Sequence, residues 1–471
     1  MIGGDAPYSV KQLMHKMGSS NFLVATTRRP PGGTTPPGGT IRRREVAMDA
    51  QAGMLARLFE RSMGLGEEWE VSDVWFEARE GASDELHVRV ARSRGKAARC
   101  PVCGRACGAH DSRERTWRHL DIWQYETIVH CAVPRPDCPE HGVRTARMPW
   151  EVRPNSHFTA LFEAQVLVMA RSGMTVSAIS SHLGEPGHRL WRMLRRAVAE
   201  ARESADYSGV VRVGIDDASR ARGQSYISVM CDLDAGRVVA VTGGRDRGAP
   251  ARPCAQLEAH GGDASAVAEV TRDMARAYSL GCADAMPGAA QTVDRFHVMQ
   301  PLGRAVDRTR CAEARSSAEK RALLRGTKYC WLKRPENLTE RQAARKGALL
   351  GERLLTARAC AMAEEMRAIY SLPTRLEASP ALKSLVSWMR HSNVPEMKRA
   401  ALTLREEREG ILNWWSRSST NALMEGVNSV IQSAKRAARG FRDIANFETI
   451  IYLRLGGLDF SAQTAALSAS H

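Results

Sequence analysis

The sequence predicts a multidomain α+β protein, in which a cysteine- and histidine-rich module and a set of helices precede a strand-rich domain with a long helical insertion. Three observations indicate this order. Cysteines and histidines gather over residues 100–150, helical patterns cover 158–204, and alternating apolar runs over 209–300 give way to charged helical sequence over 301–410. The 471 residues suffice for several domains of about 100–200 residues each.

The composition indicates a folded protein with a polyanionic partner. Hydrophobic residues make up 43% of the chain, enough to form buried cores. The 68 Lys and Arg residues outnumber the 52 Asp and Glu residues, which gives a formal net charge of +16 and an isoelectric point near 9.7. Nucleic acid matches this charge better than an anionic membrane does, and a basic protein without such a partner is the alternative.

Neither a membrane segment nor a secretion signal is indicated. No run of about 18 consecutive apolar residues occurs, and the N-terminus lacks an apolar signal core. Of the eleven cysteines, five lie between Cys100 and Cys138 and the others are scattered singly. This pattern is typical of a reducing cytoplasm and of a metal site rather than of a disulfide framework.

The N-terminal part predicts a disordered extension followed by a β-hairpin. Residues 1–53 include a stretch from Arg28 to Arg44 that is rich in Pro, Gly and Thr and cannot bury apolar surface. Met54 is an alternative start of the chain. Over 54–99, two alternating apolar runs flank a Gly-Ala-Ser-Asp turn, which predicts the hairpin.

Over residues 100–150 the spacing of cysteine and histidine predicts a metal site. A Cys-x2-Cys knuckle and a Cys-x2-His knuckle supply four ligands, the number that a tetrahedral structural Zn²⁺ requires. The predicted zinc ligands are Cys100, Cys103, Cys138 and His141. Strand-like sequence between the knuckles would bring them together, and Cys107 and Cys131 are alternative ligands. Buried thiols beside a surface histidine would give the same spacing without a metal.

Residues 158–204 are predicted to form a helix-turn-helix unit. After an apolar helix and a break near Gly173, Thr175 is expected to cap a second helix. The expected apolar face of that helix comprises Val176, Ile179 and Leu183. A turn at 184–187 leads to a third helix over 188–202. The arginines of that helix that are predicted to contact DNA are Arg189, Arg192, Arg195 and Arg196. A helical hairpin with a solvated basic face is the alternative.

Residues 209–300 are predicted to hold strands and one helix. The pattern from Val210 to Asp217 predicts a strand that ends in acidic residues. Two more strands are predicted on either side of a turn at 234–236, which gives a three-stranded meander. Residues 263–280 predict an amphipathic helix. A further short strand leads directly into Asp294.

The C-terminal part is predicted to be helical, with a helical insertion over 301–410 and one strong helix and a short apolar tail over 411–471. The helix around Glu425 has two expected faces. Its apolar face comprises Leu423, Val427, Val430, Ile431 and Ala434. Its polar face comprises Glu425, Asn428, Gln432, Lys435, Arg436 and Arg439. Lys435, Arg436 and Arg439 form a basic track beyond Glu425. This arrangement suits a metal bound at the carboxylate and a DNA backbone bound along the basic track.

Three acids suit phosphodiester chemistry. Two divalent ions about 3.5–4 Å apart can activate an attacking oxygen and stabilise a leaving oxygen. Mg²⁺ is usually held by a few carboxylates together with substrate phosphates. The candidate ligands are Asp216, Asp294 and Glu425. From residue types alone, two turn acids and a glutamate favoured by a helix N-terminus are the simpler explanation.

Several local strings resemble those of the ISL3 family of insertion-sequence transposases. They are YSLGCADAMPGAAQTVDRFHVMQPLGRAVD from Tyr278 to Asp307, GTKYCWLKRPENL from Gly326 to Leu338, ILNWW from Ile411 to Trp415, TNALMEGVN from Thr420 to Asn428, then Lys435-Arg436 and Arg439-Gly440-Phe441. The knuckles and the helix-turn-helix stand where this family has them, although Cys138-Pro-Glu-His141 departs from a four-cysteine pattern. The resemblance covers about residues 54–460, and the DRFH and EGVN strings are its specific part.

The resemblance implies a DNA transposase with an RNase H-like catalytic domain and a helical insertion before the last acid. The three family acids correspond to Asp216, Asp294 and Glu425, and Asp216 is preferred over its neighbour Asp217 because it directly follows the strand. Lys435, Arg436 and Arg439 are expected to contact DNA. His297 is expected either to orient a phosphate or water or to serve in packing.

The resemblance also implies the cofactors and partners. Mg²⁺ or Mn²⁺ would serve catalysis beside the structural Zn²⁺, and the partners would be double-stranded DNA of the terminal inverted repeats and of the target. A homodimer or a larger assembly in the nucleoid of a prokaryotic cytoplasm is expected. Two other functions stay open at this point: a DNA-binding regulator that has lost catalysis, and an RNase H-like nuclease.

Overall fold

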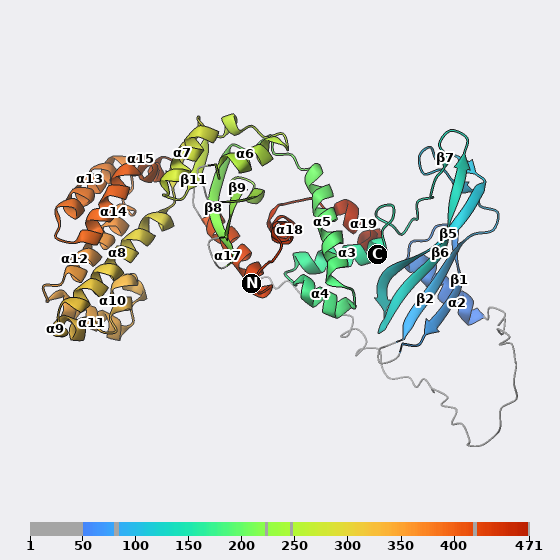
Figure 1. Cartoon of the computed structure of the whole chain (residues 1–471), viewed down its shortest axis with the longest axis horizontal. Coiled ribbons are helices and arrows are strands. Elements are labelled where there is room, and N and C mark those ends of the chain that lie inside the picture. Colours follow the sequence, from blue (N-terminus) through green and yellow to red (C-terminus); the bar gives the residue numbers. More distant parts are fainter. Residues whose placement is uncertain (1–49, 80–83, 222–224, 245–247, 418–421, 470–471) are drawn as a thin grey trace, which may run out of the picture. The chain divides into compact units, whose positions relative to one another are not determined.

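The computed structural model describes residues 50–79, 84–221, 225–244, 248–417 and 422–469. Residues 1–49, most of the predicted disordered extension, lie outside the described residues. Gly53–His471 forms one compact unit, which contains the sheets described below (Figure 1). No helix within the described ranges combines the length and apolarity needed to cross a membrane.

The first sheet contains the predicted hairpin. Its strands are β1 (Trp69–Glu77), β2 (Glu85–Arg92), β5 (Ala109–Ile122), β6 (Tyr125–Cys138) and β7 (Gly142–Val143). The order is β1-β2-β6-β5, with β7 paired to β6, so the hairpin is continuous with the Cys/His segment through the parallel pair of β2 and β6. In its core, the rings of Trp69 and Trp117 each meet Trp150 edge-on, with 5.4 Å between ring centroids. Helix α2 (Ala50–Ser62) adds Phe59 to this core.

The helical unit that follows has the predicted helix-turn-helix order. Its helices are α3 (Ala160–Arg171), α4 (Val176–Leu183) and α5 (Gly187–Glu203), and the C-terminal α19 (Ser461–Ala469) packs on α3. The Thr175 hydroxyl accepts a hydrogen bond from the Ala178 N–H at 3.2 Å and caps α4 as predicted. Gly184 ends α4 with a φ of 69°, a left-handed conformation that glycine adopts without strain. The predicted apolar face of α4 is buried.

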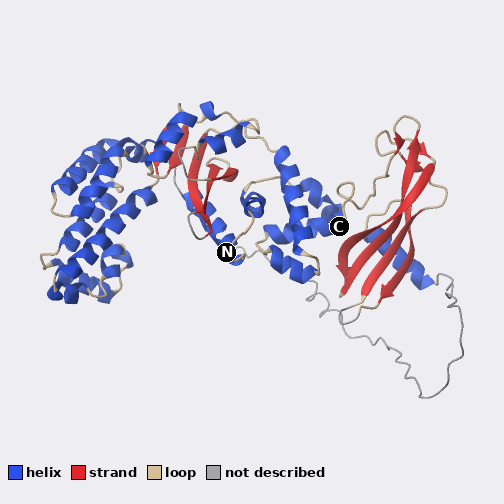
Figure 2. Ribbon diagram, in the orientation of Figure 1, coloured by secondary structure: helices blue, strands red, loops and turns tan. Residues whose placement is uncertain are grey.

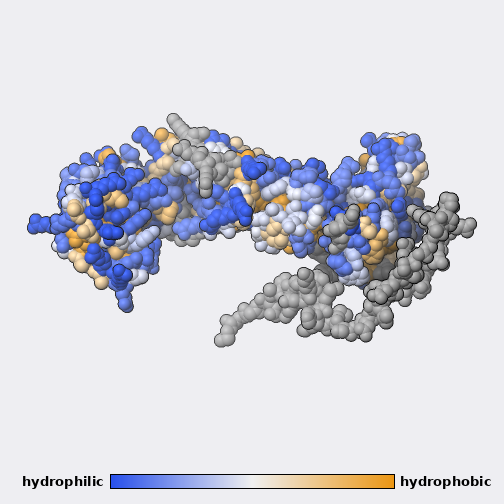
Figure 3. Space-filling view, turned by 60° about the horizontal axis from the view of Figure 1, so that its bottom comes forward, coloured by the Kyte–Doolittle hydropathy of each residue, from blue (hydrophilic) through white to orange (hydrophobic). Residues whose placement is uncertain are grey.

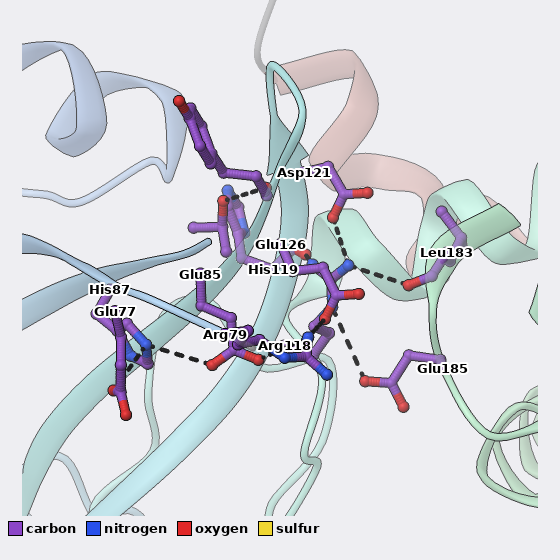
Figure 4. A network of polar contacts seen from close by, with 12 residues as sticks. Glu77, Arg79, Glu85, His87, Arg118, His119, Asp121, Glu126, Leu183 and Glu185 are labelled. Carbon is purple, nitrogen blue, oxygen red and sulfur yellow. Dashed lines mark hydrogen bonds and ion pairs between the residues drawn. The ribbon is translucent and has the colours of Figure 1, made fainter. Parts of the chain in front are cut away.

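A buried arginine ties the first sheet to these helices. Arg118 of β5 is 4% exposed. Its guanidinium donates hydrogen bonds to Asp121 and, at 3.1 Å, to the carbonyl oxygen of Leu183, and lies 3.9 Å from the carboxylate of Glu185 (Figure 4). A buried charge is tolerated only when it is paired and hydrogen-bonded, so these contacts hold the end of α4 against β5.

The second sheet is mixed, as the resemblance to an RNase H-like domain implied. Its strands are β8 (Arg212–Ala221), β9 (Ser225–Asp232), β10 (Arg237–Gly243), β11 (Glu269–Arg272) and β12 (Ala290–Val293). The order is β10-β9-β8-β11-β12. The predicted meander of β8, β9 and β10 is antiparallel, whereas β11 runs parallel to both β8 and β12. Figure 2 shows the strands in red and the helices in blue.

The prediction of one amphipathic helix over 263–280 is wrong. This segment forms the 3₁₀ helix η1 (Ala264–Ala266), the interior strand β11 and the start of α7 (Arg276–Ala285), and a further helix, α6 (Ala251–Glu258), precedes it. All four residues of β11 are buried. A short parallel strand that is covered on both faces lacks the alternation by which strands are recognised, so the tertiary environment overrides the local pattern here.

Helices cover both faces of the second sheet. α17 (Ala422–Ala437) and α18 (Ile444–Leu455) pack on one face, and α6 and α7 pack on the other. Val213 and Ile215 of β8 belong to the core on the α6–α7 side, whereas Gly214 lies against Met424 of α17. Because successive strand residues point to opposite faces, β8 contributes alternately to the two cores.

The insertion between β12 and α17 is almost wholly helical, as predicted. Its helices are α8 (Arg295–Ser316), α9 (Ala318–Leu324), α10 (Lys328–Leu332), the 3₁₀ helix η2 (Pro335–Asn337), α11 (Glu340–Leu350), α12 (Leu355–Ile369), α13 (Arg375–His391), α14 (Pro395–Glu406), α15 (Arg408–Leu412) and α16 (Trp414–Arg417). One apolar core unites these helices and includes Val293 of β12. On the face drawn in Figure 3, the described surface is mostly hydrophilic with small hydrophobic patches.

A buried ion pair joins the second sheet to the insertion. Arg272, the last residue of β11, is 3% exposed. Its guanidinium donates hydrogen bonds to Gln291 Oε1 at 2.5 Å and to Glu407 Oε2 at 2.6 Å. Glu407 lies between α14 and α15 and is 8% exposed. Removal of one partner would leave the other polar groups buried and uncompensated.

We therefore expect Arg272→Met to destabilise the protein by about 3–5 kcal/mol, because Glu407 would keep a buried charge without its partner. Chemical denaturation followed by tryptophan fluorescence measures the change. Arg375→Met is the control, since Arg375 pairs with Glu409 at 2.6 Å on the surface, where ion pairs contribute at most about 1 kcal/mol. Equal losses in the two variants would contradict the role given to the buried pair.

Candidate functional site

The two adjacent aspartates of β8 point to opposite faces of the sheet. Asp217 lies on the same face as Ile215, and its Oδ1 accepts hydrogen bonds from the hydroxyls of Ser228, at 2.9 Å, and Tyr278. Ser228 belongs to β9 and Tyr278 to α7. Asp217 is therefore engaged with the α6–α7 side of the sheet.

Asp216 faces the other side, where α17 lies. Its Oδ2 accepts a hydrogen bond from the side-chain amide of Asn428 on α17. From the sequence, Asp216 is preferred over Asp217 because Asp216 is expected to follow the strand directly. The strand does not end at Asp216, however, because β8 continues to Ala221.

Asp273 and Asp294 follow two neighbouring parallel strands. Arg272 at the end of β11 pairs with Val293 at the end of β12, so the two acids that come next lie at the same edge of the sheet. Asp294 caps α8 by accepting a hydrogen bond from the Phe296 N–H at 2.9 Å, and it is 5% exposed. Asp273 was not predicted as a site residue, because its segment was interpreted as a helix. The β-branched pair just before Arg272 was the available signal for a strand.

His297 lies among three of these acids. Its Nε2 is 3.5 Å from Asp216 Oδ1 and 3.7 Å from Asp294 Oδ2, and its Nδ1 is 3.2 Å from Asp273 Oδ1. Burial acts to lower the pKa of His297, but hydrogen bonds to Asp216 and Asp273 outweigh it and raise the pKa to about 10. The imidazole therefore belongs to the polar cluster.

Glu425 approaches this cluster from the first turn of α17, where its side chain is exposed. α17 packs closely on β8, since a Cβ atom at Gly214 would come within 2.8 Å of Met424 Sδ. Burial raises the pKa of Asp294 to about 6, with smaller contributions from the charges of Asp216 and Glu425 and against the lowering effects of the Phe296 N–H and of His297. The three predicted acids therefore act electrostatically on one another.

The basic track predicted on α17 is shorter than expected. Lys435 Nζ donates a hydrogen bond to the backbone oxygen of Ser219 in β8 at 2.7 Å, and Arg436 is exposed. The helix ends at Ala437, so Arg439, with a φ of 55°, lies beyond it. Val430, expected on the apolar face, is 38% exposed because that face is narrower than predicted.

The two knuckles come together near one end of the first sheet. Cys100 and Cys103 lie in the turn between β3 (Ala98–Arg99) and β4 (Ala106–Cys107), Cys138 ends β6, and His141 lies in the turn before β7. Their four ligand atoms all lie within 4.8 Å of one another, and within the described ranges no other group of His, Cys, Asp and Glu is this tight. The Cys138 Sγ is 3.7 Å from Cys103 Sγ and 3.5 Å from His141 Nδ1.

The environments of Cys100 and Cys138 favour the thiolate form that binds metals, whereas the pKa of Cys103 is raised by burial and by the neighbouring thiols. Burial acts to raise the pKa of the Cys138 thiol. The hydrogen bond from the backbone N–H of Glu140 outweighs burial and lowers this pKa to about 7. The alternative ligand Cys131 lies in the core of the sheet, where burial raises its pKa to about 12. The Cys107 thiol donates a hydrogen bond to the Arg105 carbonyl oxygen at 3.4 Å and is not part of the tight group.

The four arginines predicted on α5 have different surroundings. Arg189, Arg192 and Arg196 line a cavity of about 130 Å³ against the loop 153–158. Arg189 also pairs with the buried Glu185 at 2.7 Å. Arg195 points elsewhere and pairs with Asp443, the cap of α18, at 3.4 Å.

Three protein-family models match the chain in the order of these structural units. They are a zinc finger of the transposases of IS204, IS1001, IS1096 and IS1165 over residues 96–141, a helix-turn-helix domain of transposase family ISL3 over 147–198, and an ISL3 transposase domain over 213–451. The last model contains the three predicted acids.

Two similar proteins match over most of their length. The transposase for insertion sequence element IS1557 of Mycobacterium tuberculosis is 28% identical over 436 residues, which cover 85% of this chain and 96% of that protein. The transposase for insertion sequence element IS1001 of Bordetella parapertussis is 25% identical over 398 residues, or 83% of this chain and 96% of that protein. Since the transposase domain model alone spans half of the residues, and the zinc finger and helix-turn-helix models precede it, the chain belongs to the ISL3 family of transposases.

Proposed function

We propose that this transposase cleaves and joins DNA at the acidic cluster of Asp216, Asp294 and Glu425, with Mg²⁺ or Mn²⁺ as cofactor. The observation that carries the proposal is the convergence of Asp216 and Asp294, from separate strands, on His297 Nε2 at 3.5 and 3.7 Å. Burial and neighbouring negative charge raise the pKa of Asp294, so a bound cation would relieve an unfavourable charge at this place. Carboxylate oxygens are also the donors that Mg²⁺ prefers.

Each residue has a distinct part in this proposal. Bound divalent ions would supply an activated attacking oxygen and a stabilised leaving oxygen for phosphoryl transfer. The carboxylates of Asp216, Asp294 and Glu425 hold the charge that binds these ions. Asn428 orients Asp216 by its hydrogen bond to Oδ2. His297 is held between Asp216 and Asp273, which places its ring beside the proposed metal ligands.

Zn²⁺ is the proposed occupant of the Cys/His group. Three thiols and one imidazole nitrogen within 4.8 Å of one another match the donor set and number of a structural zinc site. The ligands come from two turns that are distant in sequence, so zinc would fasten the β3–β4 turn to the end of β6. Its role is to stiffen the module rather than to take part in catalysis.

Double-stranded DNA is proposed to contact α5 and the start of the basic track. Arg192 and Arg196 are exposed beside the cavity at the loop 153–158, and Arg436 is exposed on α17. The terminal inverted repeats and the target are the proposed DNA partners. A homodimer or a larger assembly is proposed because both ends of an element must be processed together.

The acidic cluster is tested by Asp216→Asn, Asp294→Asn and Glu425→Gln. Each keeps the size of the side chain but removes the charge that holds a divalent ion, so each should abolish cleavage and strand transfer of element-end DNA while leaving DNA binding intact. The measurement is gel analysis of cleaved and joined products with Mg²⁺. Combining the three substitutions should reduce the cleavage rate no further than each one alone, because the loss of one carboxylate already disables the acidic cluster.

Asp217→Asn is the matched control for the cluster, because asparagine keeps an oxygen that can accept the hydrogen bonds from Ser228 and Tyr278. It should retain much of the activity. An inactive Asp217→Asn together with an active Asp216→Asn would reverse the assignment. Cleavage without joined products would instead support a nuclease.

The zinc site is tested by elemental analysis of the purified protein, which should contain about one zinc per chain. Cys138→Ser should lose this zinc and unfold the module, because the binding energy of a structural site contributes to folding. Cys107→Ser, in the same module but outside the tight group, should keep it. Stable, DNA-binding protein without zinc would contradict the proposal.

The role of α5 is tested by comparing Arg192→Ala with Arg195→Ala. Arg192 lies beside a concave cavity suited to a phosphate, so its loss should weaken binding to all DNA sequences and reduce the salt dependence of log K by about 1. Arg195 pairs with Asp443, so its loss should matter less. Titrations at several salt concentrations measure both. A loss confined to the element-end sequence would show that Arg192 reads a base instead.

A further inference from the structure

A groove on the helical insertion begins next to the acidic cluster. It has a volume of about 510 Å³ and runs between α8, α10 and α12. Its lining residues are Phe296, Met299, Gln300, Gly303, Arg304, Asp307, Arg308, Lys328, Leu332 and Arg367. Phe296 stands at the cluster end, because its N–H donates to Asp294 and its ring meets the His297 ring edge-on with 5.5 Å between centroids. Asp307 lies eleven residues further along α8, about 16 Å at 1.5 Å per residue.

The groove combines an exposed aromatic ring with an excess of cations. Phe296 is 52% exposed, although it is a large apolar side chain. Four of the lining residues are cationic, and the single acid, Asp307, already pairs with Arg310 at 2.6 Å and with Lys328 at 3.7 Å. A ligand of this groove must therefore offer both an apolar flat surface and negative charge.

One cation in the groove has an unsatisfied nitrogen. Arg367 Nη1 is buried and has no hydrogen-bond partner within the structure, which is costly for a charged group. Arg367 comes from α12 and shares the groove with Arg304 of α8. Because Nη1 has almost no exposed surface, a ligand in the groove does not reach that nitrogen, but the two arginines add positive charge that attracts a phosphate.

The floor of the groove is a glycine that the fold itself does not require. Gly303 lies inside α8, where glycine costs up to about 1 kcal/mol relative to alanine. Its φ is not in the left-handed region, and a Cβ atom there would meet no atom within 4 Å. The missing side chain therefore serves neither backbone geometry nor helix packing, and its effect is to keep the groove open.

We propose that this groove binds unpaired nucleotides of the DNA strand that passes the acidic cluster. A base would stack on Phe296, and its phosphates would meet Arg304 and Arg367. Aromatic platforms combined with a cationic channel are the means by which proteins bind single-stranded DNA without sequence preference. Paired bases stack on one another and leave no face for the ring, so unpaired nucleotides are favoured over duplex. The inference rests on the proposed function in taking DNA as the ligand.

The test fills the groove without disturbing the fold. Gly303→Leu places a side chain in open space and removes a helix-destabilising glycine, so the melting temperature should not fall. Gly347→Leu is the matched control, because Gly347 lies inside α11 of the same helical insertion, also has no atom within 4 Å of its Cβ position, and does not line the groove. Both variants and the wild type are titrated with a fluorescent oligothymidylate and with a hairpin duplex of equal phosphate number, without added divalent ion.

We expect Gly303→Leu to bind the oligothymidylate at least about 10-fold more weakly than the wild type, because this is the effect of losing the stacking of one base. Its affinity for the duplex should stay within about twofold, and Gly347→Leu should match the wild type on both. Phe296→Ala should show the same selective loss and Phe296→Tyr should restore binding. An unchanged affinity of Gly303→Leu, or an equal loss on single-stranded and duplex DNA, would overturn the proposal.

The same titration separates this inference from the proposed chemistry. Asp294→Asn removes the charge of the cluster but not the groove, so it should keep the oligothymidylate affinity of the wild type. If Asp294→Asn still cleaves DNA, the proposed catalytic role fails while the groove stands. If Gly303→Leu binds normally while Asp294→Asn is inactive, the groove fails while the catalytic proposal stands.

Discussion

The close packing of α17 on β8 is the contact on which the acidic cluster depends. Gly214 provides the space, because any Cβ atom there would collide with Met424, the residue before Glu425. The alternation of β8 then turns Asp216 to this side and Asp217 to the other. A Cβ atom at position 214 would displace the side-chain ends of Met424 and Leu233. The close contact between α17 and β8 therefore uses a glycine that carries no chemistry itself.

The parallel strands β11 and β12 set the other half of the cluster. Their register brings Asp273 and Asp294 to one edge of the sheet, and His297 bridges both with Asp216. Arg272, immediately before Asp273, is tied to Glu407, so the edge that presents the acids is also the edge that holds the insertion. This arrangement explains why the groove on α8 starts at the cluster: α8 is capped by Asp294 itself.

The first sheet and the helix-turn-helix unit are held together by specific contacts, and α5 presents exposed cations. Zinc bound by the Cys/His group would fasten the β3–β4 turn to the end of β6, and Arg118 ties the first sheet to the end of α4. On α5, burial of Leu190 and Leu194 orients the helix and leaves Arg192 and Arg196 exposed. Arg189 and Arg195, which look equivalent to them in the sequence, are paired with acids in the fold.

The sequence by itself determined the features that depend on residues close together in the chain. The two knuckles, the Thr175 cap and the hairpin are of this kind, because spacing and period are local properties. The tertiary structure alone decided the identity of β11, the presence of Asp273 beside His297, the end of the α17 track before Arg439 and the groove over Gly303. Each of these features depends on which distant segment packs against it. The local sequence of a buried strand or of an exposed helical glycine does not distinguish it from an ordinary helix, so only the packed neighbours reveal it.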